Sequence, residues 1–158
     1  MPKKNMAAFV FSAADKHVIV ALHGKKSPSA GEWSQYITLA REHYRTHPRI
    51  ILAGVTATLG GAPDSKQRKQ LIEASSTESL ASPGAVISDS PMIRGIITAF
   101  LWMRKNNLRA FAPNAFREGL THVGLPETEF VRFLTQAQAA SASVADDPVA
   151  EVLKSNPH

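Results

Sequence analysis

The stretch that decides the fold covers residues 49–72 and begins with an apolar run, Ile50-Ile51-Leu52-Ala53-Gly54-Val55. An apolar run of this kind favours a strand that is covered on both faces, as in a parallel sheet between layers of helices. A loop over residues 56–63 follows. Asp64-Ser65-Lys66-Gln67 then predicts a helix start, because Asp64 and Gln67 have the spacing of a capping box. In open α/β sheets, ligands and partners bind at the carboxyl ends of the parallel strands, so a site is expected at this loop.

The chain before this stretch predicts a hairpin and a helix. Two β-rich runs, at residues 7–12 and 17–23, are separated by four small or polar residues, which is typical of an antiparallel hairpin. Ser29 and Glu32 form a second capping-box pattern and begin a helix with one apolar face. This helix should end before Pro48, because the residue that precedes a proline avoids helical angles.

The chain after residue 64 predicts further alternation of helices and strands. We expect a helix over 65–74, a strand over 85–88, an apolar helix over 92–105 begun by Ser90-Pro91, a strand over 108–112, and helical segments over 113–134. The 92–105 helix should be the main core helix or share a surface with another subunit. The fold class is therefore α/β, a five-stranded mostly parallel sheet with an N-terminal antiparallel hairpin and four to five helices. Residues 1–136 would form the domain and 137–158 a flexible tail, since the tail is rich in Ala, Ser and Asp.

Composition limits the classes of function. The 158-residue chain has no cysteine, which excludes disulfides, thiolate metal sites and cysteine nucleophiles. No apolar run is long enough to span a membrane, so we expect a cytoplasmic protein. The formal charge of +5 favours anionic partners, but the lysines and arginines are scattered without interleaved aromatic residues, so nucleic acid is disfavoured as a partner.

Enzymatic, cofactor and metal sites are also disfavoured. Ser88, Asp89 and Ser90 follow a strand, but Ser90-Pro91 is explained as a helix cap, and no nucleophile has a convincing base, so we predict no catalytic residues. Gly60-Gly61 lacks the lysine and serine of a P-loop and the glycine spacing of a dinucleotide site, so no cofactor is expected. His43 and His47 are four residues apart and could share a helical face, but His47 falls at the helix end, and no metal site is predicted.

The order of elements resembles a STAS-type domain, the group of the anti-sigma-factor antagonists with the SpoIIAA-like fold. The resemblance covers residues 7–134 and rests on the opening hairpin, the apolar strand with its loop and polar helix, and Val86-Ile87-Ser88-Asp89-Ser90 before the apolar helix. The resemblance implies a non-enzymatic regulatory module of bacterial signalling with a kinase-like protein partner. By position it also implies Ser65 as a phosphoacceptor. Here the loop is longer than in the antagonists, and Lys66-Gln67-Arg68-Lys69 replaces the apolar residues that usually follow the serine.

Ser65 has a physical basis as a switch, because a phosphate at a helix N-terminus is stabilised by the helix dipole and by free N–H groups. The alternative is that Asp64-Ser65 simply begins the helix. We expect a partner-binding surface made of residues from this loop and helix and from the start of the next helix: Thr58, Gly60, Gly61, Asp64, Lys66, Arg68, Lys69, Ser90 and Arg94.

Two other functions remain open. A small-ligand or lipid carrier would have a pocket of several hundred cubic ångströms between the sheet and the 92–105 helix, lined by aromatic residues such as Trp33, Tyr36, Tyr44, Phe100 and Trp102. A self-associating module would form a homodimer through an exposed apolar helix.

Overall fold

The sheet has the predicted composition and directions. The computed structural model describes residues 3–13, 16–49, 52–74, 82–103 and 107–156, so predictions for residues 50–51, 75–81 and 104–106 lie outside the described residues. Five strands in the described chain pair in the order β1-β2-β3-β4-β5. Strands β1 and β2 are antiparallel and the remaining pairs are parallel, which confirms the hairpin and the mostly parallel sheet. The strands are β1 (Met6–Ala13), β2 (Lys16–His23), β3 (Leu52–Thr58), β4 (Gly84–Ile87) and β5 (Leu108–Phe111).

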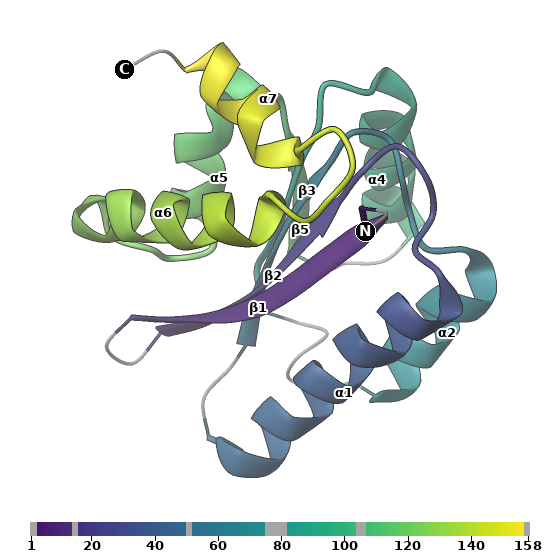
Figure 1. Cartoon of the computed structure of the whole chain (residues 1–158). Coiled ribbons are helices and arrows are strands. Elements are labelled where there is room, and N and C mark those ends of the chain that lie inside the picture. Colours follow the sequence, from purple (N-terminus) through teal and green to yellow (C-terminus); the bar gives the residue numbers. More distant parts are fainter. Residues whose placement is uncertain (1–2, 14–15, 50–51, 75–81, 104–106, 157–158) are drawn as a thin grey trace.

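The helices form a layer on each face of the sheet (Figure 1). Helices α1 (Ala30–Thr46), α2 (Ser65–Ala74) and α4 (Pro91–Met103) each connect two parallel strands. Right-handed crossovers that add strands in one direction place their helices on one face, and these three helices share a face. The opposite face is covered by α5 (Phe116–His122), α6 (Phe130–Ser141) and α7 (Pro148–Ser155), with short 3₁₀ turns at Pro113–Ala115 and Glu127–Glu129. The described chain thus has six α-helices, slightly more than the four to five expected.

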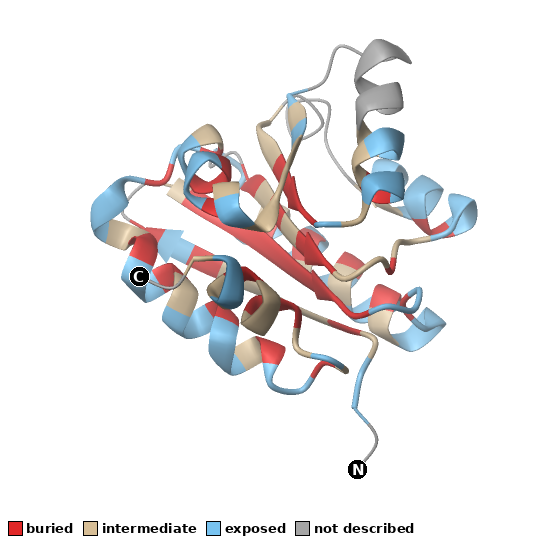
Figure 2. Cartoon of the chain, turned by 90° about the horizontal axis from the view of Figure 1, so that it is seen from above, coloured by how far each residue is buried: buried red, intermediate tan, exposed pale blue. Residues whose placement is uncertain are grey.

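The α5–α7 face contains the main hydrophobic core (Figure 2). Alternate residues of the central strands point to it, among them Val20 and Leu22 of β2, which are at most 1% exposed. Leu120 of α5 is fully buried in the same core, and the rings of Phe11 and Phe133 meet edge to face with centroids 5.3 Å apart. This face is close-packed.

The α1–α2–α4 face has two smaller hydrophobic clusters. Trp33 and Ile37 of α1 pack on Ala21, and Ala40 of α1 packs on Ile19 and Leu52. The helix begins at the predicted capping box, in which Ser29 accepts from the Glu32 amide and Glu32 accepts from the Ser29 amide, and it ends at Thr46, before Pro48 as predicted.

The C-terminal segment differs from the expected flexible tail. Residues 137–155 form the end of α6, a turn and α7, and Val144, Val149 and Val152 are at most 6% exposed in the main core. Asp147 caps α7 by accepting from the Ala150 amide, and it also accepts from the Ser141 hydroxyl. The expectation was wrong because a few valines at the right spacing bury enough surface to fix a segment whose average composition is small and polar.

Two boundaries also differ from the sequence prediction. Strand β3 continues through Thr58, where the loop had been expected from residue 56, because Thr56 and Ala57 pair with Val86 and Ile87 of β4. Of the α4 side chains that the structure describes, only Ile93 is buried. The described part of α4 is therefore not the main core helix, since α5, α6 and α7 occupy that role.

Candidate functional site

The loop after β3 is fixed by hydrogen bonds to its own strand and to the β2–α1 connection. The Thr58 hydroxyl donates to the Gly61 carbonyl at 2.5 Å and accepts from the Gly60 amide at 3.0 Å. The Gly61 amide donates to the Gly24 carbonyl at 2.9 Å, and a Cβ at Gly61 would lie 2.2 Å from the Lys26 carbonyl oxygen. Thr58, Gly60 and Gly61 were predicted to face a partner, yet Thr58 and Gly61 are buried and all three hold the loop in place.

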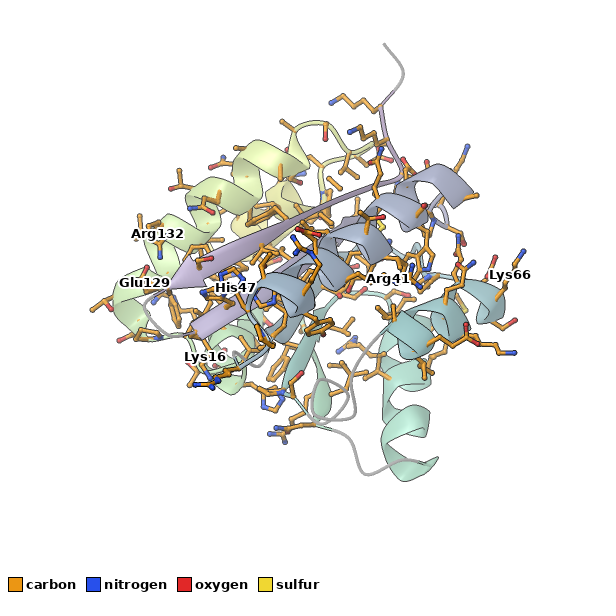
Figure 3. The ribbon with its side chains drawn as sticks, turned by 90° about the horizontal axis from the view of Figure 1, so that it is seen from below. Lys16, Arg41, His47, Lys66, Glu129 and Arg132 are labelled. Carbon is orange, nitrogen blue, oxygen red and sulfur yellow. The ribbon has the colours of Figure 1, made fainter. Side chains whose placement is uncertain are left out.

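The tip of α2 is exposed in the way the sequence predicts. The capping box is present, because the Gln67 amide donates to Asp64 Oδ1 at 2.8 Å and the Asp64 amide donates to Gln67 Oε1 at 2.9 Å. Asp64, Ser65 and Lys66 are exposed, and Figure 3 shows Lys66 pointing away from the molecule. Arg68 and Lys69 are also exposed. Of the predicted partner surface, the part on α2 is therefore accessible.

Helix α2 is held against α1 and the β2–α1 connection by two buried hydrogen bonds. The Trp33 indole N–H donates to the Gln67 carbonyl at 2.9 Å, and the Gln67 side-chain amide donates to the Pro28 carbonyl at 3.1 Å. Gln67 thus caps its own helix and ties that helix to the preceding connection. The position of α2 over the sheet is set by these contacts.

The start of α4 is shaped by two serines. Buried Ser88 accepts from the Ser90 amide at 3.1 Å, and the Ser90 hydroxyl accepts from the Ile93 amide at 3.3 Å, so Ser90 caps α4 as expected. Ser90 and Arg94 are half-buried. The Ser88-Asp89-Ser90 segment thus serves as a helix cap.

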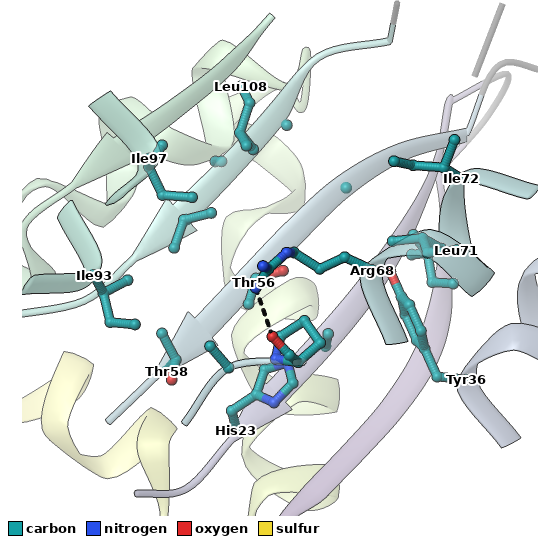
Figure 4. A pocket seen from close by; sticks show the side chains of 18 of the residues that line it. His23, Tyr36, Thr56, Thr58, Arg68, Leu71, Ile72, Ile93, Ile97 and Leu108 are labelled. Carbon is teal, nitrogen blue, oxygen red and sulfur yellow. Dashed lines mark hydrogen bonds between the residues drawn. The ribbon is translucent and has the colours of Figure 1, made fainter. Parts of the chain in front are cut away.

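A cavity of about 370 Å³ lies between the sheet and helices α2 and α4 (Figure 4). It reaches Trp33, Tyr36 and Tyr44, three of the aromatic residues that the carrier hypothesis names; the side chains of Phe100 and Trp102 lie outside the described ones. Most of its lining is apolar, including Ile19, Ala21, Leu52, Leu71, Ile72, Val86, Ile93, Ile96, Ile97 and Leu108. The cavity follows from small residues on this face of β3, since a Cβ added at Gly54 would meet no atom within 4 Å.

Few polar side chains line this cavity. Arg68 reaches over it from α2 and donates to the Pro63 carbonyl at 2.9 Å (Figure 4). His23, at the end of β2, is 2% exposed, and its Nδ1 has no hydrogen-bond partner within the described structure. Burial lowers the pKa of His23 to about 4, with Glu32 opposing the shift, so its ring is neutral at pH 7. Burial also raises the pKa of Tyr36, which keeps that hydroxyl protonated.

Sequence reasoning missed His23 and one other histidine. His23 was only the last residue of a β-rich run, and the signal that could have found it is its place at the carboxyl end of a parallel strand. His17 lies beside His43 and His47, so the pair on α1 has a third imidazole neighbour from another element. The sequence pattern did not show it because His17 precedes His43 by 26 residues.

None of the described helices combines the length and the apolar character needed to cross a bilayer. The sequence matches none of the protein-family models and none of the curated proteins with which it was compared. Among solved structures, the chain is similar to an uncharacterized protein of the DUF3478 family from Shewanella loihica PV-4, described as having a SpoIIAA-like fold. The TM-score is 0.55 at 12% sequence identity, and the match covers 78% of this chain and 97% of that one. The chain therefore has a SpoIIAA-like, STAS-type fold, as the order of its elements predicted.

Proposed function

We propose that this chain is a non-catalytic STAS-like binding module that holds a small apolar ligand in the cavity between the sheet and helices α2 and α4. The observation that carries the proposal is the cavity itself, whose volume of about 370 Å³ is that of a small-molecule site. A filled core between the sheet and α4 would have excluded the carrier hypothesis. The cavity favours it instead.

The lining suggests the chemistry of the ligand. Its walls are mainly aliphatic and aromatic, which suits an apolar body. The neutral ring of His23 offers Nδ1 as a buried hydrogen-bonding atom, and a ligand with one neutral polar group could pair with it. Thr58 is already engaged with Gly60 and Gly61. A lone imidazole among apolar walls supports binding better than catalysis.

Calorimetric titration of the full chain with 1-decanol, a medium-chain alcohol whose one polar group is a neutral hydroxyl, tests this proposal. Gly54→Leu should fill the cavity and weaken binding at least about tenfold, because the new side chain occupies space where a Cβ meets nothing within 4 Å. Gly31→Leu is the matched control, since Gly31 is an exposed position on α1 with similar open space. Equal binding by all three proteins, or no binding by the wild type, would refute the proposal.

A second candidate function, partner binding in bacterial-type signalling, is favoured by the exposed tip of α2. Ser65 is the first residue of the helix and Lys66, Arg68 and Lys69 follow it on the surface. A phosphate on Ser65 would lie near the helix N-terminus and these cations, which would change the charge that a partner meets. The partner would be a kinase-like protein or another regulator, and a cytoplasmic location stays part of this proposal.

Affinity capture from the source cells tests the second candidate. The Lys66→Ala/Arg68→Ala/Lys69→Ala variant should recover less of a specific partner than the wild type. A control variant with Arg41→Ala, Arg45→Ala and Lys154→Ala should recover as much partner as the wild type. Mass spectrometry of the captured protein tests Ser65 directly. If Ser65 stays unmodified and Ser65→Glu leaves recovery unchanged, the phosphoserine switch is wrong.

Self-association would use exposed apolar residues of α4 and α2, of which Ile72 and Ile96 also line the cavity. Met92 is 68% exposed and Ile96 43% exposed on α4, and Ile72 is 40% exposed on α2. Exposed apolar residues of this kind suit either ligand entry or a homodimer contact. Light scattering separates the two, because a Met92→Glu/Ile96→Glu variant should be monomeric if the wild type is a dimer.

A further inference from the structure

Three imidazoles from two elements meet at the edge of the sheet opposite the cavity loop. His17 is the second residue of β2, His43 lies in the last turn of α1, and His47 is the C-cap residue of that helix. Potential ligand nitrogens, one from each ring, all lie within 4.8 Å of one another. The rings are also in contact, with His43 and His47 stacked at 4.9 Å between centroids and His17 at 5.0 Å from each.

The topology brings these residues together. Helix α1 runs back across the sheet from the end of β2 toward the start of β3, so its last turn lies over the beginning of β2. His17 points to the α1 face, as do the other residues of its alternation, Ile19 and Ala21. On α1, the His47 amide donates to the His43 carbonyl at 2.8 Å, which keeps the two rings one helical turn apart.

Hydrogen bonds determine which nitrogen of His47 is available. The Thr46 hydroxyl has the Glu42 carbonyl as an acceptor at 2.9 Å, and it can in turn accept from His47 Nδ1–H at 2.8 Å. This arrangement places the ring proton on Nδ1 and leaves a lone pair on Nε2. A neighbour that fixes the tautomer of a histidine in this way is typical of metal-ligating imidazoles.

The other two rings lack a complete set of partners. His17 Nδ1 and His43 Nε2 are 2.7 Å apart and share one proton. His43 Nδ1 is buried without a hydrogen-bond partner in the described structure.

We propose that His17, His43 and His47 bind one divalent first-row transition-metal ion, of which zinc is the best match, with a fourth position open to water. Imidazole suits zinc, copper and nickel, whereas magnesium and calcium prefer oxygen ligands, and the cluster contains no carboxylate. Nitrogens around a tetrahedral zinc ion lie about 3.3 Å apart, so the His17 and His43 nitrogens need to separate slightly and His47 needs to approach. His47 is exposed at the helix end, which gives it freedom to move and gives the ion a path of entry (Figure 3).

The ion would replace the proton that His17 and His43 share. With His17 binding through Nδ1 and His43 through Nε2, each ring keeps its proton on the other nitrogen. The ring proton of His43 is then carried by its buried Nδ1. The site is independent of the cavity, and the ligand-binding proposal can fail without affecting it.

Titration of the metal-free full chain, with no histidine tag, against Zn²⁺ tests the proposal. We expect one ion per chain in calorimetry and, with Co²⁺ as a spectroscopic probe, the visible absorption of a tetrahedral nitrogen-ligated ion. His47→Ala should weaken binding at least about tenfold, because it removes one of three ligands from an exposed position that the fold does not need. His122→Ala is the control, since His122 is a half-buried histidine on α5 outside the cluster.

The outcomes are distinct. One-to-one binding that His47→Ala weakens and His122→Ala preserves supports the site. Absent binding, or binding that is equal in wild type and His47→Ala, overturns it and leaves a stacked histidine cluster that only packs α1 on the sheet. His17→Asn is a second variant, which removes another of the three ligands, and circular dichroism checks that it folds. Its residual zinc binding should match that of His47→Ala.

Discussion

The two faces of the sheet are built from the same strands but packed very differently. On the α5–α7 face, alternate strand residues such as Val20 and Leu22 meet fully buried side chains from three helices. On the α1–α2–α4 face, the intervening positions include Gly54 and Thr56, and a cavity remains under α2 and α4. The helices on this second face lie within the crossovers, and those on the first follow the last strand.

The comparison assigns different roles to the two faces. A close-packed face gives most of the stability, because each buried apolar side chain excludes water and fills space. The less filled face costs stability but leaves room for a ligand and exposes the helix tip that could meet a partner. Substitutions on the two faces should therefore change the free energy of unfolding by different amounts.

Truncation of a core side chain should have the largest effect. Leu120→Ala on α5 should lower the free energy of unfolding by about 2–5 kcal/mol, because it leaves a cavity in a fully buried position. Ile96→Ala on α4, where the side chain is 43% exposed, should cost less than about 1 kcal/mol. Urea denaturation of both variants measures the difference. Similar losses would mean that the α4 side supports the fold as much as the core does.

Acid should destabilise the cavity face through His23. Its folded pKa of about 4 lies below the ordinary value of 6.5, so the unfolded chain binds the proton more tightly. Stability from this group is complete above pH 6.5 and is lost as the pH falls toward 4, by about 3 kcal/mol in total. Unfolding free energies from pH 7.5 to 4 should thus fall more steeply for the wild type than for His23→Asn. Parallel curves would show that the pKa of His23 is the same in the folded and the unfolded protein.

Adding a leucine side chain to each face of the sheet should change the stability in opposite directions. Gly119→Leu places a Cβ 3.4 Å from the Phe111 ring and 3.6 Å from Ala85, so overpacking should cost about 1–3 kcal/mol. Gly54→Leu enters open space and should leave stability unchanged or raise it slightly. Thermal unfolding followed by circular dichroism compares them. A large loss for Gly54→Leu would mean that the cavity does not admit a side chain.

The smallest effect is expected at the tip of α2. Asp64→Ala removes the cap of the Gln67 amide and should cost about 1 kcal/mol. Ser65→Ala, at the next exposed position, should be close to neutral. Chemical denaturation of the two variants measures this difference. Equal stability of both would show that the capping box contributes little to the fold.

The order of elements could be predicted from the sequence because local signals fix it. The capping boxes at Ser29 and Asp64 and the break at Pro48 are short-range patterns, and the structure contains all three as expected. The alternation of apolar strands and helices then favours a parallel sheet. These signals act within a few residues of one another.

The features that could not be predicted depend on contacts between distant segments. Val144 and Val152 are buried only because α6 and α7 return to the sheet, which the local composition does not show. His17 and His43 meet through the path of α1, and the cavity depends on how far α2 and α4 lie from Gly54. Of the candidate site, the exposed α2 tip followed from its polar sequence, whereas the roles of Thr58 and Gly61 in closing the loop did not.

The late position of α5, α6 and α7 in the sequence has a consequence for synthesis on the ribosome. All five strands lie before residue 112, and the helices that cover one side of them extend over residues 116–155. A nascent chain that has just completed β5 would therefore present Val20, Leu22 and Val55 to solvent until about forty more residues have been added. At roughly 5–20 residues per second this interval lasts a few seconds, which is long enough for chaperones to engage that bare surface.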